Sequence, residues 1–245
     1  MAILITNDDG YSIGLRTLFD VSREFDRSSY AVIPHQQRSA VAMSLTLHKP
    51  LRLHKREENI FELSGTPADC VLFSIYSGEV KRPTLVLSGI NFGDNCGLSA
   101  LVGSGTLGAC WMAATEGIPG IAFSMYRTNK EWRDKGNWLD VNKMKQKCTE
   151  IIKLLKPKLE PHVFYNVALP NDLSKSKIVF SDSLQVRRFE TVVERREDPT
   201  GTPYFWIYGN FSKSEPGTDL YDVAVNKNIV ISKVDLKKLA KKGGI

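Results

Sequence analysis

AILITNDDG, residues 2–10, begins with a short apolar run and ends in a polar turn. An apolar run of this length, followed directly by turn residues, predicts a β-strand that is buried on both faces. Residues 15–24 then have the apolar spacing of a helix, and the apolar residues 30–34 predict a second buried strand. A strand, a helix and a strand in succession favour an α/β fold whose sheet is mostly parallel and covered by helices on both faces.

The rest of the chain continues this alternation. Residues 67–74 are expected to form a helix, with Thr66 as the N-cap and Pro67 at the first helical position. Further strands are predicted over residues 45–53, 60–63, 84–88, 120–124, 163–167 and 228–234. Further helices are predicted over residues 106–116 and 141–155, and one is expected to begin at Thr218 and Asp219.

A β-hairpin is predicted near the C-terminal end. Residues 184–194 and 204–210 are strand-like and flank the turn sequence DPTG at residues 198–201. A hairpin of only two strands is marginally stable by itself. This one carries Phe205, Trp206 and Tyr208, so we expect it to pack on another surface, such as a second subunit.

Composition limits the class of protein. The chain has 245 residues, of which 42% are hydrophobic, and this is enough for one large α/β domain with a sizeable core. Its net charge of +6 favours anionic partners. However, the lysines concentrate in residues 143–158 and 237–242, where runs of charge are typical of solvated helix faces. Charge alone is therefore weak support for nucleic-acid binding.

The cysteines and the N-terminus bear on localisation. Four cysteines, at positions 70, 96, 110 and 148, have the spacing of neither a zinc site nor a disulfide framework, so we expect reduced thiols in a cytoplasmic protein. Residues 1–6 lack the cationic start of a signal peptide. No apolar run approaches the roughly 18 residues of a membrane span, so no membrane association is expected.

Asp8 and Asp9 are the strongest candidates for chemistry. They follow the first predicted strand, and ligands of open α/β sheets bind beyond the carboxyl ends of strands. Two adjacent carboxylates repel each other, and a bound cation relieves that repulsion. Gly10 allows the chain to turn so that both side chains face one site. The alternative is that one of them caps the following helix, but capping does not require two carboxylates.

A second polar region follows the strand predicted at residues 84–88. Asn91 and Asn95 offer neutral oxygen atoms suited to a hard cation. Ser104 and Thr106 lie at the start of the helix predicted at residues 106–116, where free N–H groups and the helix dipole favour a phosphate group. No Gly-Lys-Ser/Thr ending is present, so this is not a P-loop. An ordinary glycine-rich turn with helix caps is the open alternative.

A third polar region follows the second predicted strand. If the first two strands are neighbours, Ser39 can reach the site of Asp8 and Asp9, whereas Arg38 is equally compatible with a phosphate contact and with an exposed surface position. The four histidines, at positions 35, 48, 54 and 162, form no pair at ligand spacing, so none is expected to bind metal.

Several of these stretches together resemble the SurE family (survival protein E, 5'/3'-nucleotidases). Residues 6–10, 38–47, 64–71, 88–95 and 104–106 match its motifs in the family's order, and residues 204–207 and 217–219 resemble its C-terminal part. The resemblance covers nearly the whole chain. It implies a Rossmann-like, three-layer α/β/α sandwich, with a catalytic core over residues 1–180. It also implies that residues 181–245 form an extension of the same domain, with a projecting hairpin that serves oligomerisation.

The resemblance also implies a site and an activity. The family's metal ligands fall on Asp8, Asp9, Ser39 and Asn95, with Asp8 and Asp9 as the catalytic residues. Its phosphate-binding residues fall on Ser104, Gly105 and Thr106, with Asn91 nearby. One divalent ion per subunit, Mg²⁺ or Mn²⁺, is implied. The expected reaction is hydrolysis of nucleoside 5'-monophosphates, and also of 3'-monophosphates, by a homodimer or homotetramer that binds no nucleic acid stably.

The chain departs from the family pattern at several positions. The turn after Gly10 is about one residue short, Ala40 replaces a common Gly, and Met43 replaces a polar residue. Ala168 replaces a common Asn, and residues 232–236 differ from the family's Thr-Pro-Leu. These departures bear on rate and substrate range more than on the expected metal ligands.

Two other functions compete with a metal-dependent phosphatase. One is an aspartyl-phosphate phosphatase in which Asp8 is the nucleophile, although the two aspartates of such enzymes are one residue apart and here they are adjacent. The other is a nucleotide- or RNA-binding module without turnover, suggested by the basic charge. Adjacent carboxylates without a metal would repel a phosphate backbone, which argues against that module.

Overall fold

A nine-stranded sheet forms the centre of the molecule. The computed structural model describes residues 2–128, 131 and 139–240. The strands lie in the order β3-β4-β2-β1-β5-β6-β7-β11-β8, and the six from β4 to β7 are parallel to one another. Their bounds are β1 (Ile3–Thr6), β2 (Tyr30–Pro34), β3 (Leu53–Glu57), β4 (Ile60–Leu63), β5 (Leu85–Phe92), β6 (Gly120–Met125), β7 (Val163–Leu169), β8 (Ile178–Phe180) and β11 (Ile229–Asp235). The predicted α/β fold with a mostly parallel sheet is confirmed.

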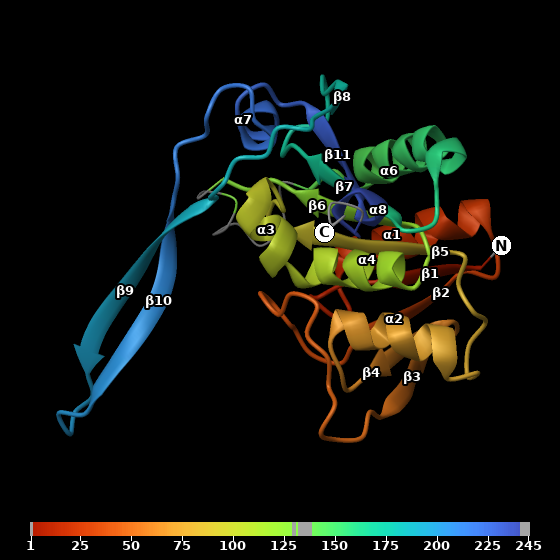
Figure 1. Cartoon of the computed structure of the whole chain (residues 1–245), viewed down its shortest axis with the longest axis horizontal. Helices are drawn as coiled ribbons and strands as arrows, with labels where there is room; N and C mark the ends of the chain where they lie inside the picture. Colours follow the sequence, from red (N-terminus) through yellow and green to blue (C-terminus); the bar gives the residue numbers. More distant parts are fainter. Residues whose placement is uncertain (1, 129–130, 132–138, 241–245) are drawn as a thin grey trace.

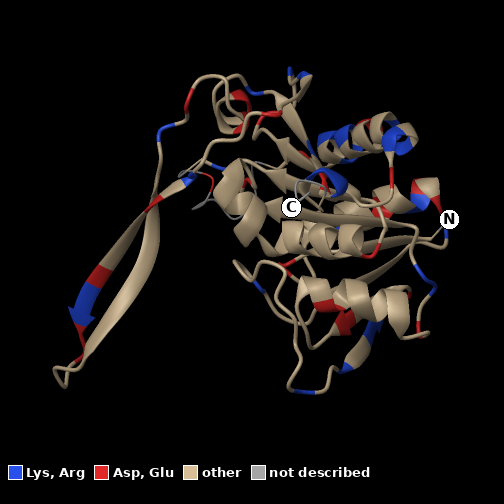
Figure 2. Ribbon diagram, in the orientation of Figure 1, with Lys and Arg blue, Asp and Glu red and all other residues tan. Residues whose placement is uncertain are grey.

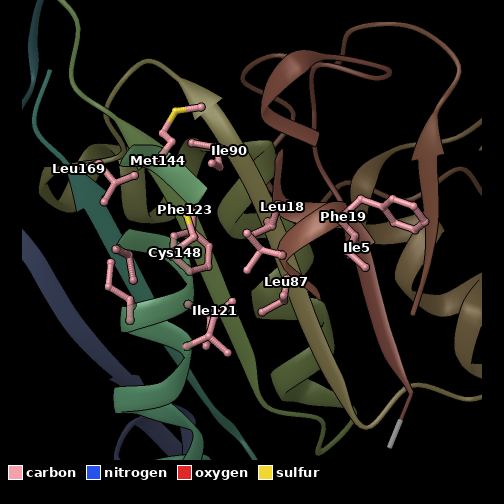
Figure 3. Close-up of a cluster of buried hydrophobic side chains, with 14 of the residues drawn as sticks. Ile5, Leu18, Phe19, Leu87, Ile90, Ile121, Phe123, Met144, Cys148 and Leu169 are labelled. Atoms are coloured by element: carbon pink, nitrogen blue, oxygen red, sulfur yellow. The ribbon is translucent and has the colours of Figure 1, made fainter. Parts of the chain in front are cut away.

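Helices cover both faces of this sheet (Figure 1). On one face lie α1 (Ile13–Phe25) and α6 (Val141–Leu155), which also contact each other. On the other lie α2 (Pro67–Tyr76) and α4 (Gly105–Thr115). Figure 3 shows how Met144 and Cys148 of α6 meet Phe123 of β6, with Leu18 of α1 beside Leu87 of β5. Burial of these apolar side chains fixes the three layers.

Side chains cap the helices that begin near the carboxyl ends of the strands. The Ser12 hydroxyl accepts from the Leu15 N–H at the start of α1, and the Ser104 hydroxyl accepts from the Leu107 N–H at the start of α4. Thr66 and Asp69 form a reciprocal capping box at the start of α2, as the predicted N-cap at Thr66 requires. Each cap satisfies backbone N–H groups that the helix itself leaves unpaired.

One strand prediction is wrong over most of its length. A strand was predicted over residues 45–53, but residues 45–52 form a loop. The Asp69 carboxylate accepts from the Thr46 N–H at 3.0 Å, which ties this loop to α2 in place of a sheet partner. Only the following residues, in β3, pair with β4. Two short helices, α3 (Gly97–Gly103) and α8 (Leu236–Ala240), and the strand β8 had no clear signal in the sequence.

The hairpin projects far from the sheet (Figure 1). Within the part of the chain that the structure describes, its strands β9 (Phe189–Glu197) and β10 (Pro203–Phe211) pair only with each other. Figure 2 shows that its charged residues lie on β9, whereas β10 carries none. After the hairpin the chain returns through α7 (Asp219–Ala224) to β11, which lies between β7 and β8. Residues on both sides of the division expected at 180/181 therefore share one sheet.

The described helices differ from membrane-spanning helices in length and composition. None is long and apolar enough by itself to cross a bilayer, and only α3 and α4 taken together meet the criterion, across a bend of 66°.

Gly108 allows α4 to lie directly against the loop that carries Ser39. A Cβ atom at this position would lie 2.0 Å from the Ala42 carbonyl oxygen, and backbone cannot yield as a flexible side chain does. We expect Gly108→Ala to lower the free energy of unfolding by about 3 kcal/mol, in spite of the better helix propensity of alanine. Urea denaturation measures the change. Gly103→Ala is the matched control, because no atom lies within 4 Å of its added Cβ; equal effects of both would contradict this packing.

Candidate active site

The carboxyl ends of β1, β2 and β5, the helix α3 and the N-cap of α4 surround one pocket of about 590 Å³. The residues that line it include most of those singled out from the sequence: Asp8, Asp9, Ser39, Asn91, Asn95 and Ser104. They come from segments up to about a hundred residues apart, and the parallel sheet brings them to one edge. The fold therefore brings these predicted residues together at one pocket.

Asp8 is a buried carboxylate at the floor of the pocket, with 4% of its surface exposed. Thr106 donates its hydroxyl hydrogen to Asp8 Oδ1 at 2.6 Å. Burial raises the pKa of Asp8 from 3.8 to about 6, although the Thr106 hydroxyl acts in the opposite direction, and the neighbouring Asp9 raises it further. A bound cation would stabilise a carboxylate in this position.

Asp9 lies closer to solvent and is linked to Ser39 through Gln37. The Gln37 amide donates to Asp9 Oδ1 at 3.3 Å and to the Ser39 hydroxyl oxygen at 3.0 Å. Burial raises the pKa of Asp9, while the Gln37 amide and the charge of Arg127 lower it. The predicted proximity of Ser39 to the two aspartates is confirmed, because β1 and β2 are neighbours and all three residues line the pocket.

Asn95 is held from its backbone while its side chain reaches the pocket. Its N–H donates to the Ser124 hydroxyl at 3.1 Å, and its carbonyl oxygen accepts from Asn166 Nδ2 at 2.8 Å. The side-chain Nδ2 is buried and has no hydrogen-bond partner among the described residues. A buried polar amide with unused capacity is expected where a ligand completes the site.

Four residues were predicted to bind phosphate, and the structure gives them different environments. Asn91 and Ser104 line the pocket, but Asn91 Nδ2 donates to the Gly93 carbonyl oxygen and the Ser104 hydroxyl caps α4. Gly105 is packed so closely that a Cβ there would lie 3.0 Å from Asp8 Cβ. The Thr106 hydroxyl is directed at Asp8. The start of α4 thus supports Asp8 directly, and Ser104 is the member of this turn that lines the pocket.

The pocket also contains residues that the sequence did not single out. Gln37 bridges Asp9 and Ser39, and Arg127, Asp94 and Arg188 line the wall. Arg127 donates to the Phe92 carbonyl oxygen at 3.3 Å. Asp94 lies within the motif stretch at residues 88–95, whereas Arg127 and Arg188 belong to no motif noted above, so only the fold could bring those two to the site. Ala40 lines the pocket in a left-handed conformation with φ of 55°, which explains why glycine suits this position.

The donor atoms fit a hard divalent cation. Asp8, Asp9, Ser39 and Asn95 offer carboxylate, hydroxyl and amide oxygens, which Mg²⁺ and Mn²⁺ accept as ligands. No group of three His, Cys, Asp or Glu side chains comes together among the residues that the structure describes, so the set lacks the soft or imidazole ligands of a zinc centre. The raised pKa values of both aspartates also favour a site where a positive charge is added.

Comparison with known proteins agrees with the motifs and the geometry. The model of the family "Survival protein SurE" matches residues 3–190. The chain belongs to the SurE family. A "5'-nucleotidase SurE" from Thermofilum pendens is 36% identical and covers 96% of this chain and 91% of its own length. A second, from Pyrobaculum arsenaticum, is 37% identical and covers 96% of this chain and 90% of its own length.

A solved structure supports the same assignment. The crystal structure of a SurE protein from Aquifex aeolicus superimposes with a TM-score of 0.78 at 30% sequence identity, over 96% of this chain and 94% of that chain. The resemblance to SurE inferred from the motifs is therefore confirmed.

The raised pKa of Asp8 predicts a pH-dependent cost to stability in EDTA. The folded protein binds a proton at Asp8 more tightly than the unfolded chain does. Protonation of Asp8 therefore stabilises the folded state fully below pH 3.8, and this stabilisation is lost as the pH rises through about 6. At pH 8, Asp8→Asn should therefore be more stable than the unmodified protein, by up to about 3 kcal/mol at roughly 1.4 kcal/mol per pKa unit.

Thermal unfolding between pH 4 and pH 8 measures this difference. Asp20→Asn is the control, since Asp20 is a half-exposed partner of Lys145 remote from the pocket. A stability difference for Asp8→Asn that does not grow with pH would contradict the burial of a charged carboxylate.

Proposed function

We propose that the protein is a divalent-metal-dependent 5'-nucleotidase that hydrolyses nucleoside 5'-monophosphates, and also 3'-monophosphates, to nucleoside and phosphate. Membership of the SurE family supports nucleotidase activity, and the curated relatives carry the name 5'-nucleotidase. The observation that carries the metal dependence is the convergence of Asp8, Asp9, Ser39 and Asn95 on one pocket. Those four residues are proposed to hold one Mg²⁺ or Mn²⁺ per subunit.

The pocket residues are proposed to have different roles in hydrolysis. When bound there, a divalent ion lowers the pKa of a water molecule and offsets negative charge on the phosphate. Asp9 lines the pocket and burial raises its pKa, so it is suited to act as a proton acceptor. Asp8 remains fixed by the Thr106 hydroxyl. Ser104 and Asn91 line the wall where the phosphate group is proposed to bind.

The two competing functions receive less support. Asp8 and Asp9 are adjacent, whereas the two aspartates of aspartyl-phosphate phosphatases are one residue apart, which argues against Asp8 as the nucleophile. Trapping of a phosphoaspartate would decide in favour of that mechanism. For a nucleic-acid module, the lysines of α6 would have to be available, yet Lys143, Lys145 and Lys147 each form an ion pair with an acidic side chain.

A cytoplasmic location is part of the proposal. All four cysteines are buried and unbridged, which suits a reducing compartment.

Activity on a panel of nucleoside 5'- and 3'-monophosphates tests the function. We expect phosphate release that is abolished by EDTA and restored by Mg²⁺ or Mn²⁺. Asp9→Asn should lower kcat by at least about a thousandfold, because it removes a metal ligand and a proton acceptor together. Asp20→Asn should retain full activity, since Asp20 pairs with Lys145 at the surface. Unchanged turnover in EDTA or in Asp9→Asn would refute the assignment.

The hairpin is proposed to join subunits into a homodimer or homotetramer. Both of its faces carry exposed apolar side chains: Phe205 and Ile207 are 59% and 74% exposed on one face, and Trp206 is 58% exposed on the other. Ile207 is opposite Val193, which is itself 60% exposed. A ribbon with this much exposed apolar surface is expected to be covered by a partner, and a second copy of the chain offers the same apolar ribbon.

Solution mass measurement tests this assembly. We expect the unmodified protein to be a dimer or tetramer by light scattering, and Ile207→Asp to shift it to the monomer with unchanged circular dichroism. Val225→Asp is the control, because Val225 is also half exposed and apolar but lies outside the hairpin. A monomeric unmodified protein would contradict the proposed role of the hairpin.

A further inference from the structure

The base of the hairpin contacts the segment that contains Asn95. Residues 185–188 lie along residues 94–99, although the two are far apart in the sequence. We propose that Arg188 is a positioning residue that fixes Asn95 in the geometry needed to bind the metal, acting through Asp94. This inference rests on the proposed function and extends it to a residue that no motif identifies.

The contact between Arg188 and Asp94 is a buried ion pair. Arg188 Nε lies 3.0 Å from Asp94 Oδ1 and 3.1 Å from Asp94 Oδ2, and both side chains are only 5% exposed. Burial raises the pKa of Asp94, and the charge and hydrogen bonds of Arg188 offset that effect. A buried carboxylate that loses its cation is left uncompensated, so the segment around it is expected to move toward solvent.

Aromatic rings hold the guanidinium group in this position. The Arg188 Cζ atom lies 4.4 Å from the centre of the Phe211 ring, 5.3 Å from that of Phe189 and 5.4 Å from that of Tyr126. Phe189 and Phe211 form the first pair of the hairpin, whereas Tyr126 follows β6 in the core. The guanidinium group of Arg188 therefore lies between aromatic rings of the hairpin and of the core. A planar guanidinium group can stack on these rings, whereas the ammonium group of a lysine could not.

Backbone hydrogen bonds continue the contact beyond the ion pair. The Leu98 N–H donates to the Gln185 carbonyl oxygen at 2.7 Å, and the Ser99 N–H donates to the Val186 carbonyl oxygen at 3.2 Å. In return, the Arg188 N–H donates to the Ser99 hydroxyl at 3.3 Å. Residues 185–188 thus fix the first turn of α3 through hydrogen bonds.

Asp219 closes the same junction from a third element. Its buried carboxylate accepts from the Gly97 N–H at 2.6 Å and from the Gln185 N–H at 2.9 Å. Gly97 has φ of +82°, and a Cβ there would lie 2.6 Å from the Gln185 carbonyl oxygen, so the two segments touch backbone to backbone. Asn95 lies between Asp94 and Gly97, and both of those residues are fixed from the side of the hairpin.

Variants of the ion pair test the positioning role. We expect Arg188→Gln to weaken Mn²⁺ binding, measured by isothermal titration calorimetry, by 10- to 100-fold, which is the range for partners that orient metal ligands. Asp94→Asn should have a similar effect, and the double variant should lose little more, because both changes remove one interaction. Arg188→Lys should recover only part of the affinity, since it keeps the charge but not the planar group.

Hydrogen exchange gives a readout that does not depend on turnover or metal. In Arg188→Gln, peptides that cover residues 94–99 should exchange at least tenfold faster, while those of the β1 and β5 strands should be unchanged. Arg56→Gln is the matched control, since it removes an arginine that pairs with Glu62 at the surface and should alter neither measurement.

The outcomes separate this inference from its alternatives. If Arg188→Gln keeps Mn²⁺ affinity and exchange of residues 94–99 within twofold of the unmodified protein, the positioning role is wrong. A raised KM in that variant alone, with Asp94→Asn unaffected, would instead make Arg188 a direct substrate contact. Should Arg188→Gln fail to fold, Arg188→Lys and Asp94→Asn carry the same comparison. Absence of nucleotide hydrolysis by the unmodified protein would refute the proposed function, while the exchange data would still decide the role of Arg188.

Discussion

Two adjacent carboxylates at the end of the central strand impose the main constraint on this molecule. Asp8 is almost completely buried, and its neighbour Asp9 adds a second negative charge to a site already poor in water. Placing charges in such a position is costly unless something offsets them. Much of the surrounding structure is arranged to do so: the Thr106 hydroxyl faces Asp8, Gln37 faces Asp9, and Arg127 contributes positive charge.

The parts of this arrangement that follow from local sequence were predictable. The apolar run ending in NDDG indicated both a buried strand and a site at its carboxyl end, and the second strand indicated that Ser39 would lie nearby. Caps such as Thr66 have a chemical pattern that can be recognised directly. By contrast, residues 45–52 alternate like a strand but are held by Asp69 and α2, and alternation alone does not show whether a sheet partner is available.

Contacts that depend on distant segments could not be predicted from the sequence. Nothing near Arg188 indicates that its partner is Asp94, or that Asn166 supports the backbone of Asn95. The turn at residues 104–106, proposed to bind phosphate, is an intermediate case, because its place at the start of α4 was predicted but the direction of the Thr106 hydroxyl was not. Met43 lies outside the pocket lining and is exposed, so that departure from the family pattern does not alter the described pocket wall.

The position of β11 has a consequence for how the chain folds during synthesis. Among the described strands, β8 joins the large sheet only through β11, although β8 precedes the hairpin in the chain and β11 follows both the hairpin and α7. The outer edge of the sheet therefore cannot form until β11, residues 229–235, has left the ribosome. Until then β7 presents an unpaired edge while the apolar ribbon is already outside the core. The nascent protein is therefore expected to need a chaperone most in the interval before β11 pairs with β7.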